Sequence, residues 1–193
     1  MKIFLDKKEL GDEYRGLTLP ELLDSVKNSL KDKILKHIYI NKVEVNERYL
    51  LESTLDKDDI KIIEFVTQST GELIKETLNE VERYLPVLKT GVLDTADLFR
   101  NGKDREANEK YQLIIEGIGW YTEVISGILA LMDNDGYYQQ VQKTLNEFNE
   151  SLTDLMIAHQ KDDLILLADI LEYEISEFID EFISISQHIS TYY

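Results

Sequence analysis

Hydrophobic residues recur at alternating spacings of four and three through four successive stretches of the sequence between residues 74 and 189. The last stretch shows the pattern most clearly, at Leu164, Ala168, Leu171, Ile175, Phe178, Phe182, Ile185 and Ile189. This spacing places one apolar stripe along an α-helix, and the stripe is buried when several such helices pack together. The four stripes therefore predict a bundle of four long helices over residues 70–191.

Turn-forming residues separate the four stretches. Asn101-Gly102 follows the first, Asp133-Asn-Asp-Gly136 follows the second, and Lys161-Asp-Asp163 precedes the last. Connections this short make consecutive helices run in opposite directions, so we expect an antiparallel four-helix bundle. Pro86 lies inside the first stretch and predicts a kink, because its ring removes one backbone donor.

Residues 1–66 show short apolar segments of a different kind, typical of strands. We expect strands at Met1–Leu5, Glu9–Tyr14, His37–Ile40, Val43–Val45 and Ile60–Val66, and turns at Asn41-Lys42 and Asp56–Asp59. Thr18-Leu-Pro-Glu21 is typical of a capping box with proline in the first turn, and it predicts a helix that ends near Lys31. One helix on a small mixed sheet predicts an α+β domain, joined to the bundle by the polar linker Thr67–Thr70.

The N-terminal pattern resembles the ubiquitin-like β-grasp of the sulfur-carrier proteins. The resemblance rests on the strand and turn of Ile40-Asn-Lys-Val-Glu-Val45 and on the acidic turn of Leu55-Asp-Lys-Asp-Asp-Ile60. It implies a β-grasp-like domain over residues 1–66. Sulfur carriers end in a free Gly-Gly, whereas this chain continues past Gly71 into a predicted helix. We therefore expect a docking module without carrier chemistry.

The sequence from about residue 96 to 182 resembles the flagellin export chaperones. The similar segments are ADLFRNGKDREANEKYQLIIEGI, ALMDNDGYYQQVQKTLNEF and Ala158–Asp163. The resemblance implies an antiparallel bundle whose outer hydrophobic grooves hold helices of an exported substrate. The chain departs from that family at its N-terminus, where a β-grasp-like domain replaces a short segment.

Negative charge is concentrated in the predicted bundle. Residues 1–68 carry 12 basic and 14 acidic side chains, whereas residues 69–193 carry 9 basic and 24 acidic ones. Such a surface repels phosphates, so we expect neither nucleic acid nor an anionic membrane as a partner. It attracts a basic protein segment or cations, although solubility alone also explains it.

Several functional classes are disfavoured by residues that the sequence lacks. No cysteine is present, which excludes disulfides, thiolate metal sites and cysteine nucleophiles. The first ten residues do not form a signal peptide, and we expect a cytoplasmic protein without a membrane span. The three histidines, His37, His159 and His188, have no serine or carboxylate at a catalytic spacing. We expect no enzymatic activity and no cofactor.

Two features of the bundle are candidate sites for a partner. Glu174, Glu177 and Glu181 share one face of the last helix, where they can receive a basic segment or a divalent cation, or remain solvated. Trp120 is either an interface anchor or a residue at the core edge. Around it, Gly117, Gly119 and Gly127 indicate close helix packing or a groove for a partner helix.

These observations favour a non-enzymatic adaptor or chaperone-like protein that binds a basic or helical protein partner. The alternative is a metal-dependent regulatory bundle that uses carboxylates of the last helix. A ferritin-type site is excluded, because Met156 and Ile185 occupy the positions three residues before His159 and His188, where that site needs glutamate. A third hypothesis is a structural protein that forms homo-oligomers.

Overall fold

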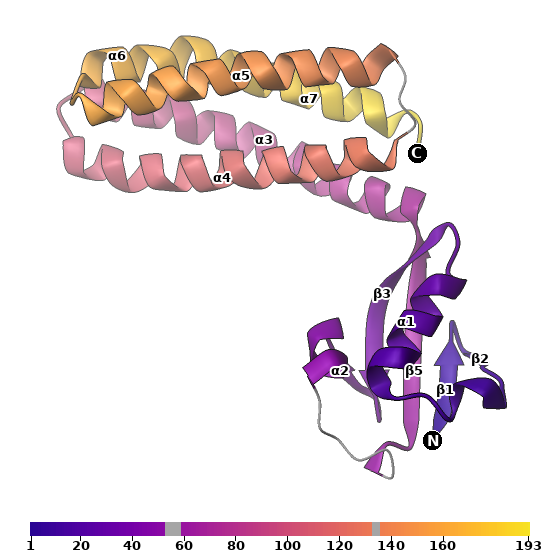
Figure 1. Ribbon diagram of the computed structural model, residues 1–193. Helices are drawn as coiled ribbons and strands as arrows, with labels where there is room; N and C mark the ends of the chain where they lie inside the picture. The colour runs from indigo at the N-terminus through magenta and orange to yellow at the C-terminus, as the bar shows by residue number, and fades with distance from the viewer. Residues whose placement is uncertain (53–58, 133–135) are drawn as a thin grey trace. The chain divides into compact units, whose positions relative to one another are not determined.

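The computed structural model describes residues 1–52, 59–132 and 136–193 and shows a mixed α+β protein (Figure 1). The chain divides into two compact units, Met1–Leu73 and Ile74–Tyr193. The first unit contains a five-stranded sheet and the second contains long helices. The predicted α+β class is therefore confirmed. Each unit has a hydrophobic core of its own.

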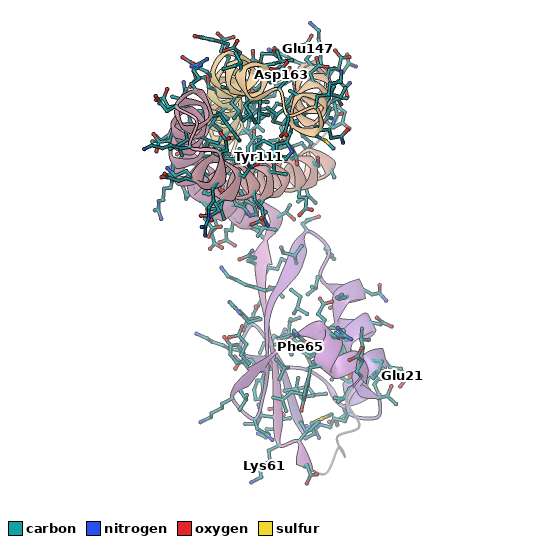
Figure 2. The ribbon with its side chains drawn as sticks, turned by 90° about the vertical axis from the view of Figure 1, so that its left-hand side faces the viewer. Glu21, Lys61, Phe65, Tyr111, Glu147 and Asp163 are labelled. Carbon is teal, nitrogen blue, oxygen red and sulfur yellow. The ribbon has the colours of Figure 1, made fainter. Side chains whose placement is uncertain are left out.

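The N-terminal unit is built around a sheet with the strand order β2-β1-β5-β3-β4. Its strands are β1 (Lys2–Leu5), β2 (Lys8–Glu9), β3 (Lys33–Ile40), β4 (Val43–Val45) and β5 (Ile62–Ser69). β1 and β5 pair in parallel, and the other neighbours are antiparallel. The helix α1 (Leu19–Ser29) contributes Leu22, Leu23 and Val26 to the core shared with the sheet. Phe65 lies inside this unit, whereas Glu21 and Lys61 lie at its surface (Figure 2).

Two local predictions in this unit are confirmed. The capping box is present, because Thr18 Oγ1 accepts from Glu21 N at 3.4 Å and Glu21 Oε2 accepts from Thr18 N at 2.8 Å. The hairpin between β3 and β4 turns at Asn41 and Lys42, whose φ angles of 50° and 70° suit a tight two-residue turn. Asn41 Oδ1 also accepts from Lys61 N at 2.8 Å, which fixes the turn beside the start of β5.

Other predictions for this unit are wrong in extent. The return strand Glu9–Tyr14 ends at Glu9, and Asp12–Tyr14 form the 3-10 turn η1. The closing strand begins at Ile62 and continues to Ser69. A short helix, α2 (Glu47–Glu52), was not expected. Most of the predicted turn Asp56–Asp59 lies outside the described residues.

The predicted linker Thr67–Thr70 is also wrong, because the chain passes directly from strand to helix. Thr67 and Ser69 pair with β3, and the helix α3 (Thr70–Arg100) follows at once. The physical reason is a reciprocal cap: Glu72 N donates to Ser69 Oγ at 3.1 Å, and Ser69 N donates to Glu72 Oε2 at 2.9 Å.

The helical unit is formed by α3, α4 (Asp104–Leu131), α5 (Gly136–Gln160) and a last rod. That rod consists of α6 (Leu164–Asp169), the π-helical segment η3 (Ile170–Ile175) and α7 (Ser176–Ser190). Figure 1 shows α4 and α5 running alongside the last rod, and residues from α3, α4, α5 and the last rod share one core. The predicted stripe of α3 is buried at Leu78, Val81 and Leu85, and α3 continues as one helix past Pro86. The predicted turn Asp133-Asn-Asp-Gly136 lies almost wholly outside the described residues.

The π-helical segment η3 was not predicted, and one residue of the predicted stripe that follows it is only half-buried. Phe178 was expected in the core but is only half-buried, whereas Ile179 is fully buried. In the same way, Ser186 is fully buried beside the expected Ile185. Phe182, Ile185 and Ile189 are buried as the heptad spacing predicts, so the buried face of α7 is wider than expected but is not displaced.

The helix α4 is long and apolar enough, by length and composition alone, to cross a membrane. The sequence interpretation did not anticipate this, because Glu116 and Glu123 interrupt the apolar residues. Residues along its length, such as Ile114, Tyr121 and Ile128, are buried in the core of the helical unit. A buried core helix passes the same test, so the finding is weak support for a span.

Candidate functional site

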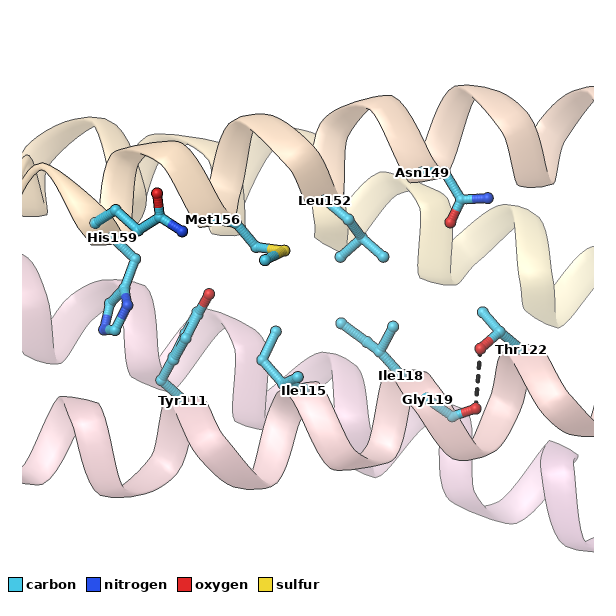
Figure 3. A pocket seen from close by; sticks show the side chains of 10 residues that line it. Tyr111, Ile115, Ile118, Gly119, Thr122, Asn149, Leu152, Met156 and His159 are labelled. Carbon is cyan, nitrogen blue, oxygen red and sulfur yellow. Dashed lines mark hydrogen bonds between the residues drawn. The ribbon is translucent and has the colours of Figure 1, made fainter.

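A groove of about 390 Å³ runs between α4 and α5 (Figure 3). Each helix contributes half of its lining, which consists of Tyr111, Ile115, Ile118, Gly119 and Thr122 from α4 and Asn149, Leu152, Met156, His159 and Gln160 from α5. The spacing of these residues follows the helical repeat, so each helix presents one continuous stripe to the groove. The stripe on α4 lies beside the core residues of the same helix.

The groove is open because one lining position has no side chain. A Cβ atom added at Gly119 would meet no heavy atom within 4 Å. The neighbouring positions carry Ile115 and Ile118 on α4 and Leu152 on the facing helix, and all three line the same space. Glycine in a helix interior costs about 1 kcal/mol relative to alanine, so the protein is less stable with glycine at position 119 than it would be with alanine.

An aromatic contact closes one end of the groove. The rings of Tyr111 and His159 stack with centroids 4.7 Å apart and an interplanar angle of 20°. His159 Nε2 lies 2.9 Å from Asn108 Oδ1, and this nitrogen carries the proton because an amide oxygen only accepts. Burial raises the pKa of the Tyr111 hydroxyl, which therefore stays protonated at neutral pH. Figure 3 shows this hydroxyl directed across the groove toward α5.

The lining of the groove contains no lysine, arginine, aspartate or glutamate. This contrasts with residues 69–193 as a whole, where acidic side chains outnumber basic ones by 24 to 9. Met156 is 55% exposed although it is apolar, and Leu152 and Ile115 are half-buried. An apolar floor with an uncharged polar rim suits the apolar face of a ligand rather than an ion.

A second hollow, of about 510 Å³, lies on the other side of α4, against α3. It is lined by Glu80, Tyr84, Leu113, Glu116, Gly117 and Trp120. The predicted anchor Trp120 meets Tyr84 edge to face, with ring centroids 5.0 Å apart at 76°. A Cβ at Gly117 would lie 2.1 Å from the Tyr84 hydroxyl oxygen, so this glycine serves close packing. Gly119 opens a groove instead, and Gly127 faces open space.

The predicted acidic stripe is exposed at Glu174, Glu177 and Glu181. Glu181 lines a hollow of about 530 Å³ between α5 and α7, away from the hollow that contains Trp120. The last rod has no lysine or arginine of its own, but Lys89 and Arg100 of α3 form ion pairs with Asp180 and Asp169, the latter at 2.7 Å. The structure therefore supplies from α3 the positive charge that the sequence of the last rod lacks.

A metal site has no support among the residues that the structure describes, since no group of three or more histidine and carboxylate side chains is placed to hold an ion. Sequence reasoning also missed the α4/α5 groove as a unit. It named His159 only as a histidine without a catalytic partner, and it left two interpretations open for Gly119. The missing side chain at Gly119 was the one sign of this groove in the sequence. It was not sufficient, because only the fold shows that α5 faces this position of α4.

Comparisons with known proteins relate the helical unit to a family of domains. A family model described as "Domain of unknown function (DUF8042)" matches residues 76–185, which lie within the helical unit. No curated protein and no solved structure was found to match the chain. The match covers both helices that form the groove, α4 and α5.

Proposed function

The chain belongs to the DUF8042 family of domains of unknown function, and we propose its role from its own geometry. The proposed role is that of a non-enzymatic adaptor or chaperone-like protein that binds a helix of a protein partner. The α4/α5 groove carries this proposal, since it combines an apolar floor with an uncharged rim. We also propose the finer fold, a β-grasp-like domain followed by an antiparallel four-helix bundle. The sheet order with one packed helix and the core shared by four rods support it.

The dimensions of the groove suit a helical ligand. Its lining on α4 extends from Tyr111 to Thr122, which at about 1.5 Å per residue corresponds to roughly 16 Å or three helical turns. Three turns of an amphipathic helix present apolar residues at intervals of three and four, and these fill such a groove. The absence of a side chain at Gly119 allows a large anchor residue to approach the α4 backbone.

The charge of the surrounding unit defines the other face of the ligand. With 24 acidic and 9 basic side chains in residues 69–193, the unit attracts a helix whose solvent face is basic. Electrostatic attraction of this kind raises the association rate, whereas the apolar face determines the lifetime of the complex. The proposed ligand is therefore an amphipathic helix with an apolar face and basic flanks.

The proposal of a binding protein, rather than an enzyme, follows from the chemistry of the lining. His159 is the one titratable side chain there besides Tyr111, and its ring is held by Asn108 and by the stack on Tyr111. No serine, lysine or carboxylate lines the groove to act as a nucleophile or an acid–base partner. The lining therefore supports binding of an apolar ligand better than its chemical transformation.

The test fills the groove from the α4 side. Gly119→Leu places an isobutyl group in the open space, and Gly127→Leu is the matched control because its Cβ also meets nothing within 4 Å. A fluorescent 14-residue amphipathic helix with leucines on one face and lysines on the other is titrated into both variants. We expect Gly127→Leu to bind as the unmodified protein does and Gly119→Leu to bind at least about tenfold more weakly.

Equal binding by the two variants, or equal binding of a peptide with the same residues scrambled, would refute the groove as the site. The natural partner is then sought by affinity capture from the cell of origin, with Gly119→Leu and Gly127→Leu as paired baits. Capture by a triple variant with Glu174, Glu177 and Glu181 changed to glutamine tests the acidic stripe separately. Loss of the partner only in that variant would move the site to the last rod.

A further inference from the structure

We propose that the hollow between α3 and α4 binds the guanidinium group of an arginine side chain presented by a partner protein. Two aromatic rings and two carboxylates line it together: Tyr84 and Glu80 from α3, and Trp120 and Glu116 from α4. Rings and carboxylates are the two kinds of group that attract a planar cation. This proposal is independent of the α4/α5 groove, which opens on the other side of α4.

The aromatic part of the hollow is held in place before any ligand arrives. Gly117 allows Tyr84 to lie directly against α4, since even one added carbon would come within 2.1 Å of its hydroxyl oxygen. Tyr84 and Trp120 then contact each other edge to face and pack against the core of the helical unit. A ligand that stacks on fixed rings loses less conformational freedom on binding, which favours the complex.

The carboxylates of the hollow are available to a cation. Within the described part of the chain, neither Glu80 nor Glu116 takes part in an ion pair. Glu116 Oε1 accepts one hydrogen bond, from Gln112 Nε2 at 3.1 Å, which leaves its other oxygen for a ligand. The two side chains come from different helices, so a cation between them can meet both.

Arginine suits this arrangement better than lysine. Its guanidinium group is planar, stacks on aromatic rings and directs several N–H donors outward in a fork that matches carboxylates. A lysine ammonium group is more strongly hydrated and lacks the flat face. Leu113, which is 65% exposed and lines the same hollow, offers an apolar surface to the methylene stem of the arginine.

Trp120 is the single tryptophan of the chain, so its fluorescence reports binding directly. The protein is titrated at low ionic strength with N-acetylarginine amide, with the lysine amide, and with the citrulline amide as an uncharged isostere. We expect a saturable change of Trp120 emission with the arginine compound, a weaker affinity for lysine and no saturable change with citrulline. Equal responses to arginine and citrulline, or equal affinities for arginine and lysine, would overturn the assignment.

Paired variants separate the hollow from the overall negative charge. The double substitution Glu80→Gln and Glu116→Gln should weaken arginine binding about tenfold, because it removes both partners of the cation. The control, Glu150→Gln with Asp154→Asn, removes two exposed charges from α5, which does not line the hollow, and should change the affinity little. Equal losses in both pairs would show general electrostatic attraction and refute the site. Gly119→Leu should bind the arginine compound normally, so this test and that of the groove fail independently.

Discussion

Alanine substitutions at Gly117 and Gly119 make the same chemical change two residues apart on α4, yet we expect them to affect stability in opposite directions. Alanine is favoured over glycine in a helix interior by about 1 kcal/mol. At Gly119 the new methyl group meets no atom within 4 Å, so the helical unit should gain that free energy in full. Gly119→Ala is therefore expected to stabilise the protein by about 1 kcal/mol.

At Gly117 the new methyl group would collide with its surroundings. Its Cβ would lie 2.1 Å from the Tyr84 hydroxyl oxygen and 3.0 Å from Leu88 Cδ1. Tyr84 cannot turn away freely, because its ring packs against Trp120 and the core. Overpacking of this kind costs about 1–3 kcal/mol, which offsets or exceeds the gain in helix propensity. The two variants should therefore differ by about 1–3 kcal/mol, with Gly117→Ala the less stable.

Urea unfolding followed by Trp120 fluorescence measures this difference. The chain has two compact units, and its one tryptophan lies in the helical unit, so the transition reports that unit. The midpoints should shift in opposite directions, or the Gly117→Ala midpoint should remain unchanged, with similar slopes in all variants. Adding Tyr84→Phe to Gly117→Ala removes the closest atom and leaves Cζ at 3.1 Å, so much of the loss should be recovered.

Equal stability of the two alanine variants would refute this reasoning, since the geometry then would not limit the residue at 117. Failure of Tyr84→Phe to recover stability would show that the hydroxyl contact is not the cause. Either result would also weaken the proposed arginine site, because that site depends on Tyr84 being held against α4.

Three further predictions concern other parts of the molecule. Burial alone would raise the pKa of Asp6, but hydrogen bonds from the side chain and backbone of Thr67 and from Lys33 lower it from 3.8 to about 2. Because the folded pKa is depressed, this stabilisation is present above pH 3.8 and is lost as the pH falls toward 2. The Asp6 side chain is 35% exposed, so Asp6→Asn should cost about 1 kcal/mol at neutral pH. This cost should decrease as the pH falls and disappear below pH 2, as measured by thermal unfolding across that range. Arg100→Leu removes the partner of Asp169, so we expect an earlier urea midpoint of Trp120 fluorescence. Because the interaction is electrostatic, this shift of the midpoint should shrink in high salt. Thr18→Ala removes the cap of α1 and should cost about 1 kcal/mol, detected as faster amide hydrogen exchange across α1 but not across α4.

The sequence alone determined the features that depend on neighbouring residues or on a regular repeat. The spacing of Leu78, Val81 and Leu85 predicted a helix with one buried face, because a helix repeats every 3.6 residues whatever it packs against. The capping box at Thr18 and the two-residue turn at Asn41 were predicted for the same reason, since their hydrogen bonds and backbone angles are local.

Only the tertiary structure decided which side chains from distant parts of the chain meet. The sequence left Gly117 and Gly119 equivalent, but one lies under Tyr84 of α3 and the other opens toward α5, because they point to different sides of α4. It also gave no sign that Arg100 would supply positive charge to the last rod, or that η3 would interrupt the regular α-helix of that rod. These contacts depend on how the helices are rotated against one another, and that rotation is set by the packing of the whole core rather than by any single helix.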